Sequence, residues 1–103
     1  MTESFRNLFS QCVLTFLDIT DLDSYNVTDT SLMFFKARSD NLVDLSRLDT
    51  SMVVEMVGMF QQACIYQLDR SNWKVKCVKD MSNMFRDAVI HTIDISRWNQ
   101  WCL

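Results

Sequence analysis

One spacing of about 25 residues recurs along the whole chain, and it constrains the fold more than any other feature. Four aspartates follow it: Asp18, Asp44, Asp69 and Asp94. Four phenylalanines follow it as well: Phe9, Phe34, Phe60 and Phe85. Within each series the separations differ by a single position, since one interval is longer by one. Because two unrelated residue types share the period, the sequence indicates an array of repeated structural units.

The period predicts a single domain of stacked repeats over residues 1–103. Its units are a partial repeat 1–16, full repeats 17–42, 43–67 and 68–92, and a partial repeat 93–103. No unit of this size can bury its apolar side alone, so we expect the units to stack with like residues in contact, as a repeat solenoid.

Each unit is expected to hold one short strand and one helical turn. Apolar and polar residues alternate at 17–19, 43–45, 68–70 and 93–95, which predicts short parallel strands there. The i, i+3, i+4 spacing of Met56, Met59 and Phe60 predicts a one-turn helix. The fold class expected is therefore a β-rich α/β stack of coils.

Stacking predicts ladders of like residues across the units. Besides the four phenylalanines, the expected ladders are Leu17/Val43/Leu68/Ile93, Leu22/Leu48/Trp73/Trp98, Val27/Val53/Val78 and Met33/Met59/Met84. A small residue follows three positions after each phenylalanine, at Cys12, Ala37, Ala63 and Ala88, which indicates a tight contact between units. Proline is absent and glycine occurs once, so the turns must be built with Asn, Asp and Ser.

The charge and hydropathy of the chain argue against several classes of binding partner and against a transmembrane helix. The net charge is −3 and the isoelectric point about 4.9, which argues against nucleic acid and against an anionic membrane surface. No run approaches the roughly 18 apolar residues that a transmembrane helix needs. The N-terminal stretch, MTESFRNLFSQCVLTF, lacks a basic flank before an uninterrupted apolar core, so no signal peptide is expected in this chain.

The repeat itself resembles a known type. Its first half is clearest at 93–99, IDISRWN, and its second half at 78–85, VKDMSNMF. Both halves recur with the same spacing from about Leu8 to the end of the chain. They resemble the repeats of the BspA-like leucine-rich-repeat surface proteins, in the subgroup with the mycoplasma-lipoprotein type of repeat. The resemblance implies a curved leucine-rich-repeat-like solenoid, a role in adhesion or protein recognition, and a location at the cell surface or outside the cell. Two residues depart from the pattern: Arg70 stands where other units are apolar, and Thr30 stands where they have Met.

The aspartate ladder is the most conspicuous polar feature. Stacked carboxylates repel one another, so either a cation such as calcium or hydrogen bonds from backbone N–H and Ser hydroxyl groups must stabilise them. We favour the hydrogen bonds, because the glycine-rich loops of calcium repeats are missing. Arg70 is placed to pair with this acidic row. Tyr25 and Trp101 share one repeat position outside the expected core and are candidate binding anchors.

The remaining chemistry-bearing residues favour structural roles. Cys77 and Cys102 occupy one repeat position in adjacent units, which leaves open either a disulfide or, with Cys12 and Cys64, four reduced and mostly buried thiols. His91 is the single histidine and no motif orients it toward catalysis. The methionines fall at ladder positions and are expected in the core.

The expected function is therefore non-catalytic, with no catalytic residue, cofactor or metal ligand assigned. We expect a module that binds protein or glycan through an extended solenoid face containing Asp18, Asp44, Asp69, Asp94, Arg70, Tyr25 and Trp101. Two alternatives stay open: a structural spacer within a longer repeat protein, and an intracellular protein-interaction module. Open coil ends also predict self-association.

Overall fold

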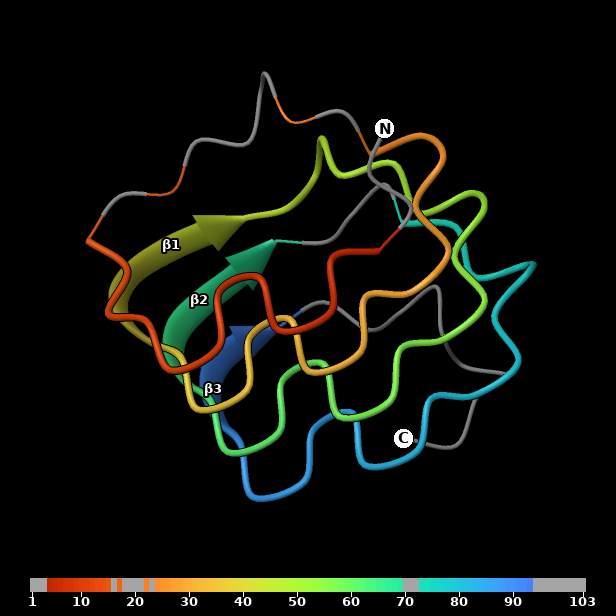
Figure 1. The fold of residues 1–103 in the computed structure, drawn as a ribbon. Coiled ribbons are helices and arrows are strands. Elements are labelled where there is room, and N and C mark those ends of the chain that lie inside the picture. The colour runs from red at the N-terminus through yellow and green to blue at the C-terminus, as the bar shows by residue number, and fades with distance from the viewer. Residues whose placement is uncertain (1–3, 16, 18–21, 23, 70–72, 94–103) are drawn as a thin grey trace.

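The repeat folds into one parallel sheet. The computed structural model describes residues 4–15, 17, 22, 24–69 and 73–93 (Figure 1). Strands β1 (Arg38–Asp44), β2 (Cys64–Asp69) and β3 (Val89–Ile93) lie side by side in that order, and both pairings are parallel. Val43, Leu68 and Ile93 occupy matching positions, which confirms that part of the expected ladder.

The strands begin several residues earlier than predicted. The strands predicted at 43–45 and 68–70 cover only the last two residues of β1 and β2, because the residues before them include many polar ones. The strand predicted at 93–95 begins at the last residue of β3, and most of the one predicted at 17–19 lies outside the described residues. In β1, Arg38, Asp40 and Asn41 are exposed, whereas Ser39 and Val43 point inward. Extended backbone needs no apolar residues on its outer side when the units on either side supply its hydrogen bonds.

A bulge in β1 explains why one repeat has an extra residue. Arg38 and Ser39 pair with residues 26 positions later, whereas Leu42 and Val43 pair with residues 25 positions later. The register therefore shifts between Ser39 and Leu42. The Ser39 hydroxyl accepts a hydrogen bond from the Asn41 N–H at 3.2 Å, which stabilises the bulge.

Opposite the sheet lies a second layer, which we call the turn layer: residues 5–12, 30–37, 56–63 and 81–88 (Figure 1). The predicted one-turn helices are wrong, since the described residues contain no helix. Each unit of this layer instead has two residues with φ near +60°, four positions apart: Asn7 and Gln11, Leu32 and Lys36, Gly58 and Gln62, and Asn83 and Asp87. A residue in this left-handed region ends a helical turn at once.

Left-handed residues redirect the backbone N–H groups toward the next unit. Leu32 N–H donates to Val57 O at 2.9 Å, and Lys36 N–H donates to Gln61 O at 2.9 Å. Between them, Phe34 N–H donates to Met59 O at 2.8 Å. Alternate N–H groups of the turn layer therefore join neighbouring units, whereas those between them close turns within one unit, as Phe35 N–H does by donating to Leu32 O at 3.1 Å.

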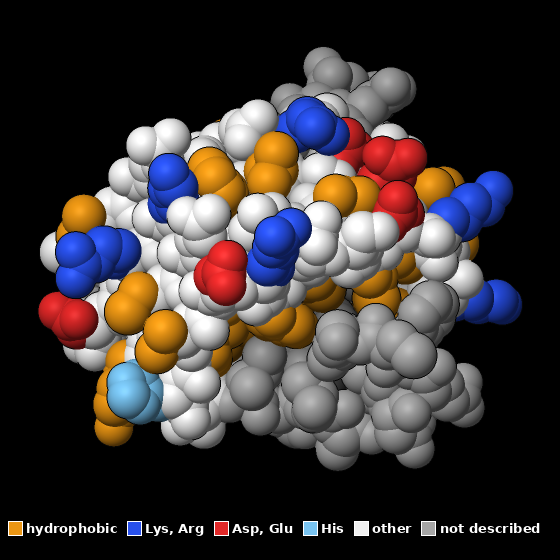
Figure 2. Space-filling view, turned by 90° about the horizontal axis from the view of Figure 1, so that it is seen from below, with side chains coloured by type: hydrophobic (Ala, Val, Ile, Leu, Met, Phe, Trp, Pro, Cys, Tyr) orange, Lys and Arg blue, Asp and Glu red, His pale blue; other side chains and the backbone are white. Residues whose placement is uncertain are grey.

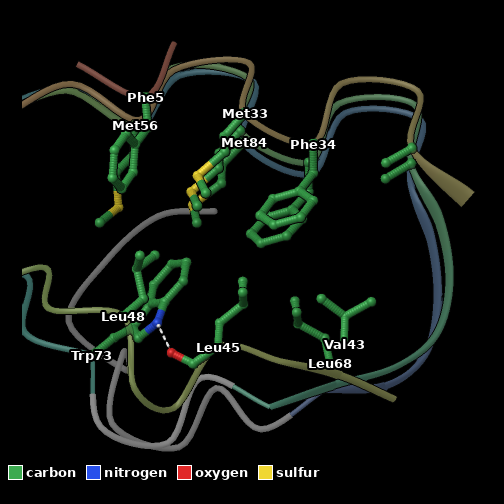
Figure 3. Close-up of a cluster of buried hydrophobic side chains, with 14 of the residues drawn as sticks. Phe5, Met33, Phe34, Val43, Leu45, Leu48, Met56, Leu68, Trp73 and Met84 are labelled. Atoms are coloured by element: carbon green, nitrogen blue, oxygen red, sulfur yellow. Dashed lines mark hydrogen bonds between the residues drawn. The ribbon is translucent and has the colours of Figure 1, made fainter. Parts of the chain in front are cut away.

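The core fills the space between the turn layer and the opposite side of the chain. Figure 3 shows Phe5, Met33 and Phe34 pointing from the turn layer toward Leu45, Leu48 and Trp73. The phenylalanine ladder is confirmed: ring centroids lie 5.4 Å apart for Phe9–Phe34, 5.3 Å for Phe34–Phe60 and 5.5 Å for Phe60–Phe85. Phe34 and Phe60 are fully buried, and burial of such a ring stabilises the fold by about 1.5–3 kcal/mol.

Polar atoms within the core have partners. Thr30, which departs from the repeat, is buried and its hydroxyl donates to the Met59 sulfur at 3.4 Å. Trp73 Nε1–H donates to Leu45 O at 3.0 Å, as Figure 3 shows. Ala37 and Ala63 are buried, in agreement with the close contact predicted for that position. No helix in the described part of the chain is long and apolar enough to cross a membrane.

Candidate binding surface

The structure describes three of the residues proposed for the binding face. They are Asp44, Asp69 and Tyr25, whereas Asp18, Arg70, Asp94 and Trp101 lie outside the described residues. Strand pairing places Asp44 beside Asp69, at the carboxyl ends of β1 and β2. Tyr25 is 56% exposed, and the described residues show no hydrogen bond or ring contact joining it to either aspartate.

Asp44 is held by its own turn. Its carboxylate accepts hydrogen bonds from the Ser46 hydroxyl at 2.7 Å and the Ser46 N–H at 3.0 Å. The hydroxyl, followed by the N–H, lowers the pKa of Asp44 below its usual value. This geometry supports the structural interpretation of that aspartate. Asp69 is half-buried, and its backbone carbonyl accepts the Leu45 N–H at 2.8 Å.

The same Asp-x-Ser turn recurs elsewhere in the repeat. Asp49 accepts hydrogen bonds from the Ser51 hydroxyl at 2.6 Å and from the Ser51 N–H at 2.9 Å. Asp80 accepts the equivalent pair from Ser82, and both carboxyl groups have lowered pKa values because of these bonds. These turns confirm that Asp and Ser build part of the backbone reversals.

Replacing Ser51 with alanine should raise the pKa of Asp49 toward its ordinary value of 3.8. The folded pKa lies below the unfolded one, so this hydrogen bond stabilises the protein above pH 4 or so and is lost as the pH falls through the folded value. At neutral pH we expect a loss of at most about 0.5–1 kcal/mol, because water screens the exposed pair. The stability difference should shrink below the folded pKa.

Carboxyl chemical shifts followed by NMR over pH measure this change directly. Ser46→Ala is the matched control, because it should raise the pKa of Asp44 and leave that of Asp49 unchanged. An unchanged Asp49 titration in Ser51→Ala would contradict the role given to the hydroxyl.

A second acidic row crosses the units. Parallel bridges join Asp29 to Glu55 and Glu55 to Asp80, so the three carboxylates lie at matching positions. Arg6 neutralises one end of the row, with its Nη1 3.5 Å from Asp29 Oδ2. Across the described ranges, no group of three or more His, Cys, Asp or Glu side chains is arranged to hold a metal ion. We assign no cation to either row.

The strands expose a different set of side chains, which the sequence analysis missed. We call it the strand face and define it as Val13, which pairs with Arg38, and six exposed side chains of the strands: Arg38, Leu42, Cys64, Tyr66, Val89 and His91. The strands also expose five polar side chains that are not part of this set: Asp40, Asn41, Asp44, Gln67 and Thr92. Val13 is 74% exposed, Tyr66 55% and Val89 54%. Figure 2 shows the histidine side chain, in pale blue, beside orange hydrophobic side chains.

Register organises the strand face into rows. Val13, Arg38, Cys64 and Val89 form one row through successive parallel pairs. In the next row Tyr66 contacts His91, with ring centroids 5.6 Å apart and planes at 43°. One sequence signal could have located this face. In Cys64, Ile65 and Tyr66 the buried Ile65 alternates with two exposed neighbours, as expected for a strand with one outward side.

The cysteines differ from expectation. Cys64 and Cys77 are exposed, Cys12 is half-buried, and all three thiols are free, so the prediction of mostly buried cysteines is wrong. Cys64 is exposed because it lies in the outward row of β2. Cys102, the second member of the suggested Cys77 disulfide, lies outside the described residues.

A polar groove lies near the carboxyl ends of the strands. It has a volume of about 470 Å³ and is lined by Ser46, Arg47, Leu48, Asp49, Thr50, Trp73 and Lys74. The Thr50 hydroxyl fixes one wall, since it donates to Lys74 O at 3.0 Å and accepts the Lys74 N–H at 2.8 Å. Trp73 is only 6% exposed, so the groove offers polar side chains rather than an aromatic platform.

A known protein family matches almost the whole chain. Residues 3–101 match the family described as Mycoplasma protein of unknown function, DUF285. The chain belongs to this family. All three strands and all four sections of the turn layer of this DUF285 protein fall within the matched region. Searches of curated proteins and of solved structures found no match.

Membership places the repeat in a Mycoplasma family but assigns no activity, since the description gives the function as unknown. The functional interpretation of this DUF285 chain therefore rests on its own surface. Two surfaces are available: the acidic turns, whose carboxylates already accept hydrogen bonds, and the strand face, whose hydrophobic side chains point to solvent.

Proposed function

We propose that this chain is a non-catalytic binding or adhesion module built as a leucine-rich-repeat-like solenoid of the BspA-like type. The observation that carries the proposal is the strand face, where Val13, Tyr66 and Val89 are each more than half exposed at positions fixed by strand register. Exposed aromatic and aliphatic side chains on a rigid sheet are suited to burial against a partner.

Long-range pairing supports the solenoid. Parallel bridges link Ser4, Asp29, Glu55 and Asp80 in sequence, so one repeat position is paired across four successive units. The strands repeat the same order on the other side of the core. Units that contact mainly their neighbours present a long continuous surface, which is the surface that repeat proteins use for recognition.

A protein partner suits the strand face better than a glycan. Three of its seven members are aliphatic and exposed: Val13, Leu42 and Val89. Sugar rings need planar aromatic platforms with nearby hydrogen-bonding groups, and here only Tyr66 with His91 provides that combination. The resemblance of the repeat to BspA-like surface proteins supports a cell-surface setting.

Adhesion of beads coated with the purified chain to a cultured epithelial cell layer tests this proposal. We expect Tyr66→Ala to reduce binding about ten-fold, the usual scale for losing an aromatic anchor. Tyr25→Ala is the matched control, because Tyr25 is 56% exposed and Tyr66 55%, yet Tyr25 lies outside the strand face.

The control also separates the two candidate faces. Loss of binding in Tyr25→Ala with retention in Tyr66→Ala would transfer the site to the face that contains Tyr25. Prior treatment of the cells with protease should abolish binding, whereas loss after glycosidase treatment alone would identify a glycan ligand. If the wild-type chain and both variants bind the cells equally weakly, the result would favour the structural-spacer alternative.

A further inference from the structure

The polar groove near the carboxyl ends of the strands has fixed walls. One wall comes from residues 46–50, after β1, and the other from residues 73–74, after β2. The Thr50 hydroxyl joins the two walls through its bonds to the N–H and the carbonyl of Lys74. Figure 3 shows the Trp73 ring among the core side chains, with its Nε1–H bonded to Leu45 O. The groove is therefore largely formed before any ligand binds.

Two cationic side chains line this groove. Arg47 and Lys74 are both exposed, and neither forms an ion pair with the described residues. The third charged side chain of the lining is Asp49, so cations exceed carboxylates there by one, although the whole chain has a net charge of −3. The groove is thus a local site for an anion on an acidic protein.

Asp49 supplies a hydrogen-bond acceptor in the same groove. Its Oδ1 accepts both bonds from Ser51, whereas its Oδ2 accepts none from the described residues. The bonds from Ser51, more than the charge of Lys74, lower the pKa of Asp49, so the carboxylate is ionised at neutral pH. An ionised carboxylate repels a bare anion but accepts a hydrogen bond from a hydroxyl group.

The backbone of the groove is already hydrogen-bonded. Asp49 N–H donates to the Ser24 hydroxyl at 2.9 Å, and both backbone groups of Lys74 are bonded to Thr50. A peptide that binds as an added strand needs backbone groups of the host, which these residues do not offer. Recognition must therefore depend on the charged side chains, which favours a compact ligand with a strong charge of its own.

We propose that the polar groove binds a phosphate monoester that carries hydroxyl groups. Its phosphate group lies between Arg47 and Lys74, and one of its hydroxyl groups donates to Asp49 Oδ2. A phosphate monoester has a charge of about −1.5 to −2 at pH 7, which matches two cations. The planar guanidinium group of Arg47 is suited to donating two parallel hydrogen bonds to phosphate oxygens. This site is separate from the strand face and does not depend on its partner.

Titration of the 103-residue chain with glycerol 3-phosphate at low ionic strength, followed by NMR, tests the proposal. We expect saturable shifts centred on the amide signals of Thr50 and Lys74 and on the indole N–H of Trp73. Glycerol, which lacks the phosphate group, should cause none. Sulfate has a similar charge but no hydroxyl group to offer Asp49, so it should bind about ten-fold more weakly.

Arg47→Gln and Lys74→Gln should each weaken the binding of glycerol 3-phosphate about ten-fold, because each removes a charged donor. Both side chains are exposed, so the fold should be retained. Lys76→Gln is the matched control, since Lys76 is exposed in the same unit but is not part of the groove lining. It makes the same change of net charge and should bind normally.

Asp49→Asn tests the hydroxyl contact. The amide oxygen can still accept the bonds from Ser51, but the repulsion of sulfate is removed. We therefore expect this variant to lose most of the preference for glycerol 3-phosphate over sulfate. Tyr66→Ala should bind glycerol 3-phosphate as the wild-type chain does, so the groove and the strand face are tested separately.

Several results would overturn the proposal. Shifts that do not saturate would do so, as would wild-type protein that binds sulfate as tightly as glycerol 3-phosphate. Equal losses in Lys76→Gln and Lys74→Gln would show that net charge, and not the groove, attracts the anion. A phosphoserine peptide that binds more tightly than glycerol 3-phosphate would replace the compact ligand with a protein segment.

Discussion

Phe60→Ala should lower the free energy of unfolding by about 3–5 kcal/mol, the usual cost of truncating a fully buried phenylalanine. Phe60 is fully buried and its ring contacts Phe34, Phe85 and Trp73, with centroids 5.3, 5.5 and 6.1 Å away. Alanine would remove contacts that join three successive units and leave a cavity that the backbone pairing prevents from collapsing.

Urea unfolding followed by tryptophan fluorescence measures this loss. Phe9→Ala is the comparison, because Phe9 is partly exposed and stacks on Phe34 alone among the described rings. We expect a cost below half of that for Phe60→Ala. Equal costs at the two positions would mean that the stack does not behave as one continuous core.

Substitutions of Gln62 should change stability in opposite directions. Gln62 has φ of 58° and its N–H donates to Arg86 O at 2.8 Å. Proline fixes φ near −65° and has no N–H, so Gln62→Pro should cost about 3 kcal/mol or more. Glycine adopts positive φ without steric cost, so Gln62→Gly should gain up to about 1 kcal/mol.

Gln61→Gly provides the control for the glycine substitution. Gln61 is adjacent but has no positive φ, so glycine there should lose about 0.5–1 kcal/mol through greater freedom of the unfolded chain. Thermal and urea unfolding of the four proteins would rank them. A Gln62→Gly variant less stable than Gln61→Gly would show that the left-handed turn does not limit stability.

The register of the units could be read from the sequence with good accuracy. The phenylalanine stack and the Val43, Leu68 and Ile93 positions appear in the structure as predicted. The extra residue in one repeat was also visible as one longer interval in both series, and the structure places it in the bulge after Ser39. Burial drives these features, and burial leaves a periodic pattern in the sequence.

The candidate binding surface was much harder to predict. The recurring aspartates pointed to Asp44, but its carboxylate already accepts hydrogen bonds from Ser46. Tyr66 and His91, which contact each other on the strand face, do not recur in the sequence and were therefore not predicted. Outward side chains vary from unit to unit because the fold does not constrain them. The repeat therefore identifies core residues by their recurrence and says little about the exposed faces.

The sequence by itself determined the period, the stacking order and the core of this protein, because each depends on apolar residues that must recur for neighbouring units to bury them. Only the tertiary structure decided that the expected helical turns are left-handed reversals. Leu32, Lys36, Gly58 and Gln62 share positive φ but no common chemistry. Hydrogen bonds from these turns to the next unit impose that geometry, and no residue pattern in the sequence indicated them.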